Sequence, residues 1–226
     1  MSPRGRLIVF LLGGAGFAVL FVLGTVHLPD FGGTWHPYGE RTVSNAVARH
    51  TPNVISSINF DQRAFDTLGE ELILMASALA AVVVLRGVQA EQEETAGAHE
   101  YGPAEVFDAL RITGYLLLPI TLVAGVYIVA HGSLSPGGGF QGGIVLGSAI
   151  HLVYLAGDYP ALARIRPIPV FESGEAVAAG AFVLLALAAA GQVTAMNAAV
   201  GAEVGCAVVL VLAKFFEQAL LVRTSS

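Results

Sequence analysis

The chain has 226 residues, of which 55% are hydrophobic and only 12% are charged, with a net charge of −6 and a mean hydropathy of +0.71. This composition excludes an ordinary soluble domain and indicates an integral membrane protein. The acidic balance gives no support to a nucleic-acid partner. The single cysteine, Cys206, excludes a disulfide or a cysteine-rich metal site built from this chain alone.

Six apolar runs predict membrane helices. A hydrocarbon core about 30 Å thick needs roughly 20 apolar residues per helix, and the runs meet or approach this length. They cover residues 7–26, 69–86, 111–130, 141–157, 174–194 and 198–222. Because these runs are continuously apolar rather than alternating in short segments, we expect an all-α membrane protein and not a β-barrel.

Arginine placement predicts the orientation of these helices. The run at 7–26 is longer than the apolar core of a signal peptide, so we expect a retained membrane helix. With a cytoplasmic N-terminus, the inner segments hold Arg4, Arg6, Arg86, Arg111, Arg164, Arg166 and Arg223, and the outer segments hold Arg41, Arg49 and Arg63. The excess of inner arginines follows the positive-inside rule. It predicts a multi-pass protein of the cytoplasmic (inner) membrane with both termini inside.

An acidic stretch divides the chain. Residues 88–105 are rich in Glu, Gly and Ala, and they separate two predicted helices from four. We therefore expect a two-helix part at 1–87, a linker at 88–105 and a four-helix part at 106–226. The sequence shows no internal repeat, and six helices make a thin bundle for a complete transport path. A subunit of a larger assembly is therefore favoured over a stand-alone carrier.

Carboxylates gather at the start of the second predicted helix. Asp66 and Glu70 are four residues apart, so a helix covering both places them on one face, and Glu71 follows directly. One interpretation is interfacial, because carboxylates complement the dipole at a helix N-terminus and Asp66 or Thr67 can be its N-cap. The other interpretation is an ion or proton path. Glu70 and Glu71 favour it because they are nearer the hydrocarbon.

The last predicted helix carries three charged residues on one stripe. Lys214 and Glu217 follow Glu203 by 11 and 14 positions, which places all three within about 40° of one another at about 100° per residue. A charge near the bilayer centre costs at least about 2.5–3.5 kcal/mol, so the stripe indicates a partner, a wet cavity or a proton path. An ion pair of Lys214 with Glu217 near the cytoplasmic surface is the alternative. It does not explain Glu203.

Further ionisable residues lie close to the membrane. His151 falls near the middle of the fourth predicted helix, where an imidazole either hydrogen-bonds a neighbouring helix or passes a proton. His131 follows the third helix. Glu172 and Glu175 stand at the mouth of the fifth, where capping by a carboxylate is an ordinary explanation. The full candidate ion or proton path is Asp66, Glu70, Glu71, His131, His151, Glu203, Lys214 and Glu217.

The segment HGSLSPGGGFQGG, residues 131–143, interrupts two apolar runs. Its proline lacks a donor N–H and its glycines are poor helix formers, so we expect a Gly-rich break between the third and fourth helices. Free backbone groups cannot face lipid, and they are tolerated only at the interface, packed in protein or lining a hydrated cavity. The segment therefore predicts either close helix packing or a polar, hydrated lining. The motif residues are Pro136, Gly137, Gly138, Gly139, Phe140 and Gln141.

These residues carry a resemblance to a known family. HGSLSPGGGFQGGIVLGSAI resembles the signature of the MnhB/MrpB family, a small membrane subunit of multisubunit Na⁺/H⁺ antiporters of the Mrp type, and NAAVGAEVGCAVVLVLAKFFEQAL is similar to its final helix. Together they cover about 106–223. SNAVARHTPNVISSINFDQRAFDTLGEELILMASALAAVVVL resembles the two-helix MbhE-type module, often the C-terminal end of the large A subunit. Gln62 and Ala64 depart from that module's pattern, which leaves the packing of the local loop open.

The resemblance implies a fusion of an MbhE-like and an MnhB-like part within a complex that exchanges Na⁺ or another monovalent cation for H⁺. It implies large antiporter-like subunits and small MnhC/MrpC-like subunits as partners in the bilayer, and it matches Asp66 and Glu70 to acidic positions of an ion or proton route. A hydrogenase-like or other redox-driven relative of complex I and a pure assembly scaffold are the alternatives. We expect no enzyme, no catalytic residues, no metal and no cofactor, because the chain lacks a cysteine set for an iron–sulfur cluster and a dinucleotide fingerprint.

Overall fold

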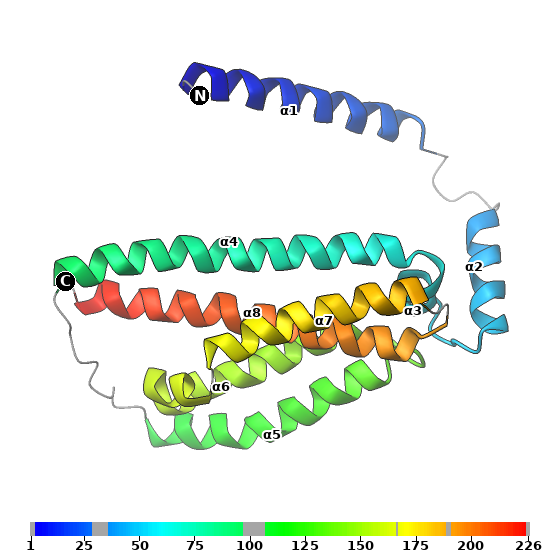
Figure 1. The fold of residues 1–226 in the computed structure, drawn as a ribbon. Coiled ribbons are helices and arrows are strands. Elements are labelled where there is room, and N and C mark those ends of the chain that lie inside the picture. Colours follow the sequence, from blue (N-terminus) through cyan, green and yellow to red (C-terminus); the bar gives the residue numbers. More distant parts are fainter. Residues whose placement is uncertain (1–2, 29–35, 97–106, 166, 189–190, 225–226) are drawn as a thin grey trace. The chain divides into compact units, whose positions relative to one another are not determined.

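The computed structural model describes residues 3–28, 36–96, 107–165, 167–188 and 191–224, and these are almost entirely helical. Six of the described helices are long and apolar enough to cross a membrane. They are α1 (Pro3–Val26), α4 (Ala64–Ala96), α5 (Asp108–Ala130), α6 (Gly139–Ile165), α7 (Ile168–Ala188) and α8 (Val193–Thr224) (Figure 1). Each predicted span overlaps one of them, so the predicted all-α, multi-pass membrane fold is confirmed.

Several helix ends differ from the predicted ends. The fourth membrane helix, α6, continues to Ile165, and the fifth, α7, already begins at Ile168. Pro167 and Pro169 flank that start, and proline is tolerated in the first turn of a helix because the N–H there has no intrahelical partner. The second membrane helix, α4, continues to Ala96, through the first residues of the predicted linker. Residues 97–105 of that linker lie outside the described residues.

Backbone contacts divide the chain into two units, residues 1–40 and 41–226. In the first unit, α1 exposes leucine, valine and phenylalanine side chains around its whole surface. A helix that is apolar all round is suited to lipid or to the apolar surface of another membrane helix. The second unit contains the other five membrane helices, and the site described below belongs to it alone.

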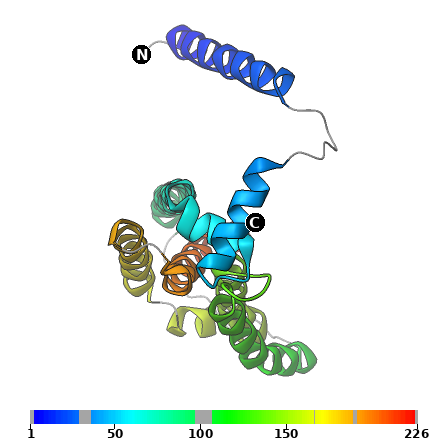
Figure 2. The same ribbon diagram turned by 90° about the vertical axis from the view of Figure 1, so that its right-hand side faces the viewer.

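Helix α8 lies at the centre of the second unit. It packs against α6, α7 and α4, while α5 packs mainly against α6 (Figure 2). The apolar core lies at the start of α8, where Met196, Val200 and Val204 surround Phe182 of α7. Because α8 has a neighbour on most of its circumference, a polar side chain in its middle is shielded from lipid.

The predicted outer loop between the first two membrane helices contains three short helical segments. They are α2 (Pro37–Ala48), α3 (Val54–Ser57) and the π-helix η1 (Ile58–Gln62). Hydropathy did not predict them because they are short and partly polar. The end of the bundle formed by α3, η1 and residues 131–138 and 191–192 is called the α3 end below.

The π-helix η1 is anchored on two sides. Its Phe60 ring meets the Phe182 ring of α7 edge-on at a centroid distance of 6.2 Å. The Gln62 amide donates to the Thr42 carbonyl oxygen at 3.1 Å and to Ser57 Oγ at 3.0 Å. The sequence left the packing around Gln62 open. In the structure, these two hydrogen bonds hold Gln62, the last residue of η1, against α2 and α3.

Candidate functional site

Three glutamates from three helices are buried inside the second unit. Glu71 of α4, Glu175 of α7 and Glu203 of α8 have relative exposures of 1%, 2% and 0%. Glu71 and Glu203 lie close enough for a direct side-chain interaction, and Glu203 also acts electrostatically on Glu175. Glu203 is therefore the middle member of a series that crosses the bundle from α4 to α7. We call these residues the carboxylate series.

The carboxylate series lies near the middle of the membrane span. Glu203 follows the first residue of α8 by ten positions, which is about 15 Å at 1.5 Å per residue. By the same measure, Glu71 lies about 10 Å from the α3 end of α4, and Glu175 about 18 Å from the α3 end of its span. The order along the bundle is thus Glu71, Glu203, Glu175. The three carboxyl groups therefore lie at different depths in the membrane and not at one level.

The described residues leave these carboxyl groups with few hydrogen bonds. Both oxygens of Glu71, both of Glu203 and Oε1 of Glu175 are buried and have no hydrogen-bond partner among them. A buried carboxylate without a donor is expensive, and two adjacent ones repel each other as well. The series therefore requires a proton, a cation or a group from another molecule to compensate its charge. This requirement is what makes it a candidate transport site.

The sequence-predicted residues Asp66 and Glu70 lie apart from the series. Asp66 is in the first turn of α4 and forms an exposed ion pair with Arg63, so it is not the N-cap considered above. Glu70 is exposed, and Glu71, its neighbour, is the residue that turns into the bundle. Thr67 is buried and donates to the Asn59 carbonyl oxygen at 2.8 Å. The face that carries Asp66 and Glu70 points away from α8.

The other candidates are spread along the bundle. His131 stacks on Tyr127 at a centroid distance of 4.0 Å and lies at the α3 end. His151 is buried on α6, where Nδ1 lies 2.7 Å from the Gly147 carbonyl oxygen and the ring is 5.6 Å from that of Phe216. Lys214 is buried farther along α8. The side chain of Glu217 lies outside the described residues.

The predicted glycine segment comprises a short connection and the start of α6. Residues 131–138 connect α5 to α6, and Gly137 and Gly138 have φ values of +137° and +131°, a backbone region that favours glycine. The later motif residues belong to α6, which begins at Gly139. Phe140 packs against the apolar core, while Pro136 and Gln141 are exposed.

Close packing accounts for the glycines of α6. A Cβ atom at Gly139 would lie 2.6 Å from the Asn197 carbonyl oxygen, and one at Gly143 would lie 2.8 Å from the Gly201 carbonyl oxygen. At Gly147 it would lie 2.8 Å from Val208 Cβ. These three positions repeat every four residues and meet successive turns of α8, so α6 and α8 run parallel with their backbones in contact. We call this contact the glycine seam.

Asn197 of α8 joins the connection to the bundle. Its side chain is fully buried, and Oδ1 accepts from the Gly139 N–H at 2.8 Å. Nδ2 donates to Ser56 Oγ and to the Val193 carbonyl oxygen, both at 2.9 Å. One amide thereby links α8, the start of α6 and α3. Asn197 was not among the candidate residues predicted from the sequence, although an asparagine in an apolar helix indicates a polar contact with a neighbouring helix.

Asn53 and Asp61 make further links at the α3 end. Asn53 Nδ2 donates to the carbonyl oxygens of Gly132 and Ser135 at 2.7 and 2.8 Å. Asp61 of η1 pairs with Arg49, and its Oδ1 also accepts from the Gly191 N–H at 2.9 Å. These contacts attach the segment before α4 to the α5–α6 and α7–α8 connections.

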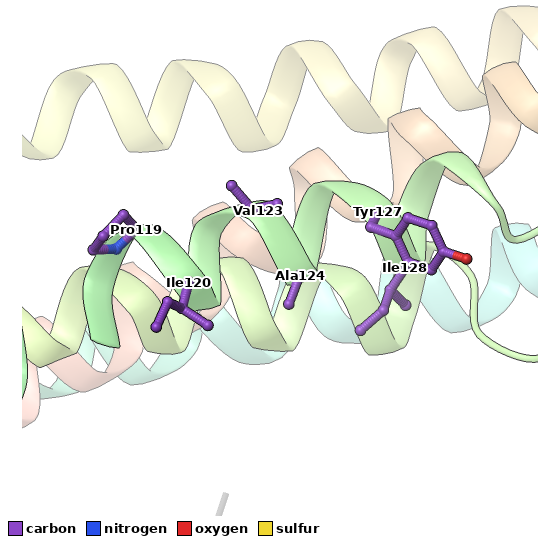
Figure 3. A pocket seen from close by; sticks show the side chains of 6 residues that line it. All are labelled: Pro119, Ile120, Val123, Ala124, Tyr127 and Ile128. Carbon is purple, nitrogen blue, oxygen red and sulfur yellow. The ribbon is translucent and has the colours of Figure 1, made fainter. Parts of the chain in front are cut away.

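Helix α5 presents a different kind of surface. A hollow of about 580 Å³ runs along its outer side, lined by Pro119, Ile120, Val123, Ala124, Tyr127 and Ile128 (Figure 3). The hollow contains no charged side chain, so it has nothing to bind an ion or guide a proton. The carboxylate series remains the candidate site.

A family model matches the C-terminal half of the chain. The family model for a domain related to the MnhB subunit of Na⁺/H⁺ antiporter matches residues 109–221, which contain α5 to α8, the glycine seam and two members of the carboxylate series. The chain belongs to the MnhB family. An uncharacterised protein of Methanocaldococcus jannaschii is 29% identical over 117 residues, which is 46% of this chain and 44% of that protein. The chain thus spans less than half the length of this relative.

Two solved structures share the fold of this MnhB-family chain. A chain of the membrane-bound sulfane sulfur reductase, an archaeal respiratory membrane complex, matches with a TM-score of 0.65 and 21% identity over 93% of this chain and 98% of that one. In the Mrp complex from Dietzia sp. DQ12-45-1b, the match has a TM-score of 0.62 and 20% identity over 95% of this chain and 26% of that one. Both matches extend beyond the MnhB domain and include most of the N-terminal part.

Proposed function

We propose that this MnhB-family chain is a membrane subunit of a multisubunit monovalent cation/proton antiporter complex, in which it contributes to an ion or proton path and to assembly. It acts as a transport subunit and not as an enzyme, in the cytoplasmic membrane. Its partners are large antiporter-like subunits and small MnhC-like subunits. The observation that carries the proposal is the carboxylate series, which buries Glu71, Glu203 and Glu175 near mid-membrane. Both oxygens of Glu71 and Glu203 and one oxygen of Glu175 lack a donor among the described residues.

The N-terminal part belongs to the same functional unit in this proposal. We interpret residues 1–87 as an MbhE-like module, 88–105 as a linker and 106–226 as the MnhB-like part. The module supplies Glu71, the first member of the series, while the MnhB-like part supplies Glu175 and Glu203. The structural matches support this joint unit because each covers more than nine-tenths of the chain.

In the proposed path, Asp66 and Glu70 form a part that is separate from the carboxylate series. Both are exposed near the start of a membrane-spanning helix, where Asp66 pairs with Arg63. A carboxylate such as that of Glu70 needs a partner or a wet cavity there. We propose that a neighbouring subunit covers this face of α4 and completes the route there. The two exposed carboxylates would then lie on a different face of α4 from Glu71, the member of the series on this helix.

Cation-driven proton exchange in membrane vesicles tests the transport role. We expect Glu203→Gln to lower the exchange rate by about tenfold or more, since losing a proton-carrying group typically removes at least that much from a proton-transfer step. The matched control is Glu40→Gln, which neutralises an exposed carboxylate on the short helix α2. Unchanged exchange in Glu203→Gln, with the complex intact, would refute the role of the series.

A redox-driven complex is the second candidate. The match to the sulfane sulfur reductase chain favours it, because that match covers nearly the whole of both chains. Gentle purification of the tagged chain from native membranes, followed by mass spectrometry, separates the two candidates. Large antiporter-like subunits without redox proteins support the antiporter, whereas co-purified iron–sulfur subunits support the redox-driven complex. The chain alone would contradict both.

An assembly scaffold predicts a different pattern of variants. In that role, exposed small residues on helices such as α7 hold the partners, and the carboxylates are dispensable. A bulky replacement at an exposed position such as Gly180 would then dissociate the complex, while Glu203→Gln would change neither assembly nor exchange. Measuring subunit content and exchange on the same membranes distinguishes a scaffold from a transport subunit.

A further inference from the structure

We infer that Glu71 and Glu203 together hold one proton, and that this pair is the proton-binding station of the chain, with Glu175 as the next acceptor. The inference rests on the proposed function and deepens it, because it assigns the proton as the ligand of this site. It also separates the roles of two adjacent residues, Glu70 and Glu71, which the sequence pattern grouped together.

The first argument is the geometry of the pair. Glu71 and Glu203 are the two most buried members of the series, and their side chains interact directly across the contact of α4 with α8. Apart from this contact with each other, none of their four oxygens has a hydrogen-bond partner among the described residues. Two carboxylates in this position repel each other, whereas a carboxylic acid beside a carboxylate forms a strong hydrogen bond. One proton therefore turns a repulsive contact into an attractive one.

The surroundings strengthen this argument because the near charges are negative. Glu70 acts on Glu71 from its own helix, and Glu175 and Glu203 act on each other. Lys214 follows Glu203 by 11 residues, which separates them by about 16 Å along α8. Among the described residues, Glu70 on α4, Glu175 on α7 and Cys206 on α8 interact electrostatically with a member of the pair, and Glu172 interacts with Glu175. The other buried ionisable groups on α8 and on α6, which packs against it, are Lys214 and His151.

The donor set favours a proton over a metal cation. Within the part of the chain that the structure describes, no group of three or more His, Cys, Asp or Glu residues is placed to hold a metal ion. Glu175 lies a step deeper than the pair and does not complete such a group. A proton needs only the two facing oxygens of Glu71 and Glu203, which the structure supplies.

A single transfer step follows from the order of the series. The O–H bond on the pair breaks, and a new O–H bond forms on the carboxylate of Glu175, so that the proton is the only group transferred. The pair then carries two negative charges side by side, so it binds the next proton and returns to its starting state. Glu203 is the link in this step because it interacts with both Glu71 and Glu175.

Infrared spectroscopy of the purified complex tests the inference directly. A protonated carboxyl group has a carbonyl stretching band that a carboxylate lacks, and we expect such a band at neutral pH in the wild-type complex. The part of this band that the pair contributes should disappear in the double variant Glu71→Gln/Glu203→Gln and remain in Glu40→Gln, which neutralises an exposed carboxylate on α2. The amide of glutamine keeps the size of the side chain and its capacity to hydrogen-bond.

Several outcomes would overturn the inference. These are a wild-type spectrum without the band, a band that the double variant retains in full, or a band that appears only after sodium and potassium are removed. The last result would assign the pair to a cation. The spectrum does not depend on transport, so a complex that exchanges cations for protons but lacks the band contradicts only the inference. A complex with the band but no exchange contradicts only the proposed function.

Carbodiimide labelling of the wild-type complex gives a second test that needs no variant. A hydrophobic carbodiimide adds to protonated carboxyl groups in the membrane and leaves carboxylates unmodified. We expect peptide mass spectrometry to find the adduct on Glu71 or Glu203 at neutral pH. Labelling of neither residue, in a sample where a known reactive carboxyl of another membrane protein is labelled, would contradict the shared proton even if the double variant fails to assemble.

Discussion

Asn197 shows how one buried amide organises an end of the bundle. It uses both donors and its acceptor within the protein, and the bonded groups belong to α8, α6 and α3. Because membrane helices gain little from hydrophobic burial against each other, such polar contacts decide which helices meet and in what register. Asn197 is therefore a positioning residue for the connection at 131–138.

Replacing Asn197 with alanine should destabilise the chain measurably. Each buried group left without a partner costs about 1–3 kcal/mol, and Asn197→Ala leaves the Gly139 N–H and Ser56 Oγ in that state. We expect the melting temperature in detergent to fall by several degrees, at about 2–4 °C per kcal/mol. Thr194→Ala is the control, since its hydroxyl meets Ser133 at an exposed position. Equal melting temperatures for the two variants would show that the amide network adds no stability.

At the residue scale, the acidic residues of α4 show that the sequence did not predict which face of this helix is buried. The i, i+4 spacing of Asp66 and Glu70 correctly puts them on one face, but it does not say which face is buried. In soluble helices the apolar stripe marks the buried side, whereas α4 is apolar nearly all round its membrane span. The carboxylate that turns inward, Glu71, is therefore identified by packing against α8 and not by periodicity.

At the scale of elements, the position of the first residue of α7 explains why Glu175 was not included in the predicted ion or proton path. The sequence analysis began this helix after Glu172, which made Glu175 a capping residue at the membrane surface. In the structure α7 begins at Ile168, so Glu175 lies two turns inside the helix. Pro167 directly precedes this start and Pro169 lies in the first turn, which accommodates proline. A shift of six residues in one helix end thus moved a carboxyl from the interface to the middle of the membrane.

The fit of α6 against α5 makes a quantitative prediction. A Cβ atom added by Gly142→Ala would lie 2.3 Å from Val129 Cγ2 and 2.9 Å from the Gly125 carbonyl oxygen. Because the second neighbour is backbone, the helices must separate, and overpacking of this kind costs about 1–3 kcal/mol. We expect a lower melting temperature and a reduced yield of assembled complex.

Gly180 provides the matched control for that variant. It lies inside α7, and a Cβ atom there would meet nothing within 4 Å. Gly180→Ala should leave the melting temperature unchanged or raise it slightly, since alanine is favoured over glycine in a helix by about 1 kcal/mol. If Gly142→Ala and Gly180→Ala have the same melting temperature, Gly142 is not required for the close contact of α6 with α5.

At the scale of the whole molecule, the arginine distribution predicts an orientation that labelling can test. Cys206 is the single cysteine, so Cys206→Ala provides a background free of thiols. In that background, we expect an impermeant maleimide to label Ser44→Cys on α2 in intact cells. Ala109→Cys, at the start of α5, should react only after the membrane is permeabilised. Both positions are exposed, so the reverse pattern would mean that the N-terminus is outside.

Sequence alone identified the membrane helices of the chain because hydropathy over about 20 residues is a strong signal. It missed α2, α3 and η1, which are short and depend on contacts such as that of Phe60 with Phe182. It also left open whether the glycines serve packing or hydration, a choice that requires the position of the neighbouring backbone. In the structure, Gly139 and Gly143 lie against α8 with no space for a side chain.

The glycine seam also has an electrical consequence. Where α6 and α8 touch along residues 139–147, even a methyl group would collide with the opposite helix, so water molecules cannot form a file between them. In the proposed path, protons that reach Glu203 would therefore not leave toward α6 along residues 139–147. A water-filled gap beside a conducting path would dissipate the ion gradient. The seam would thus act as insulation, because its glycines leave no room for such a gap.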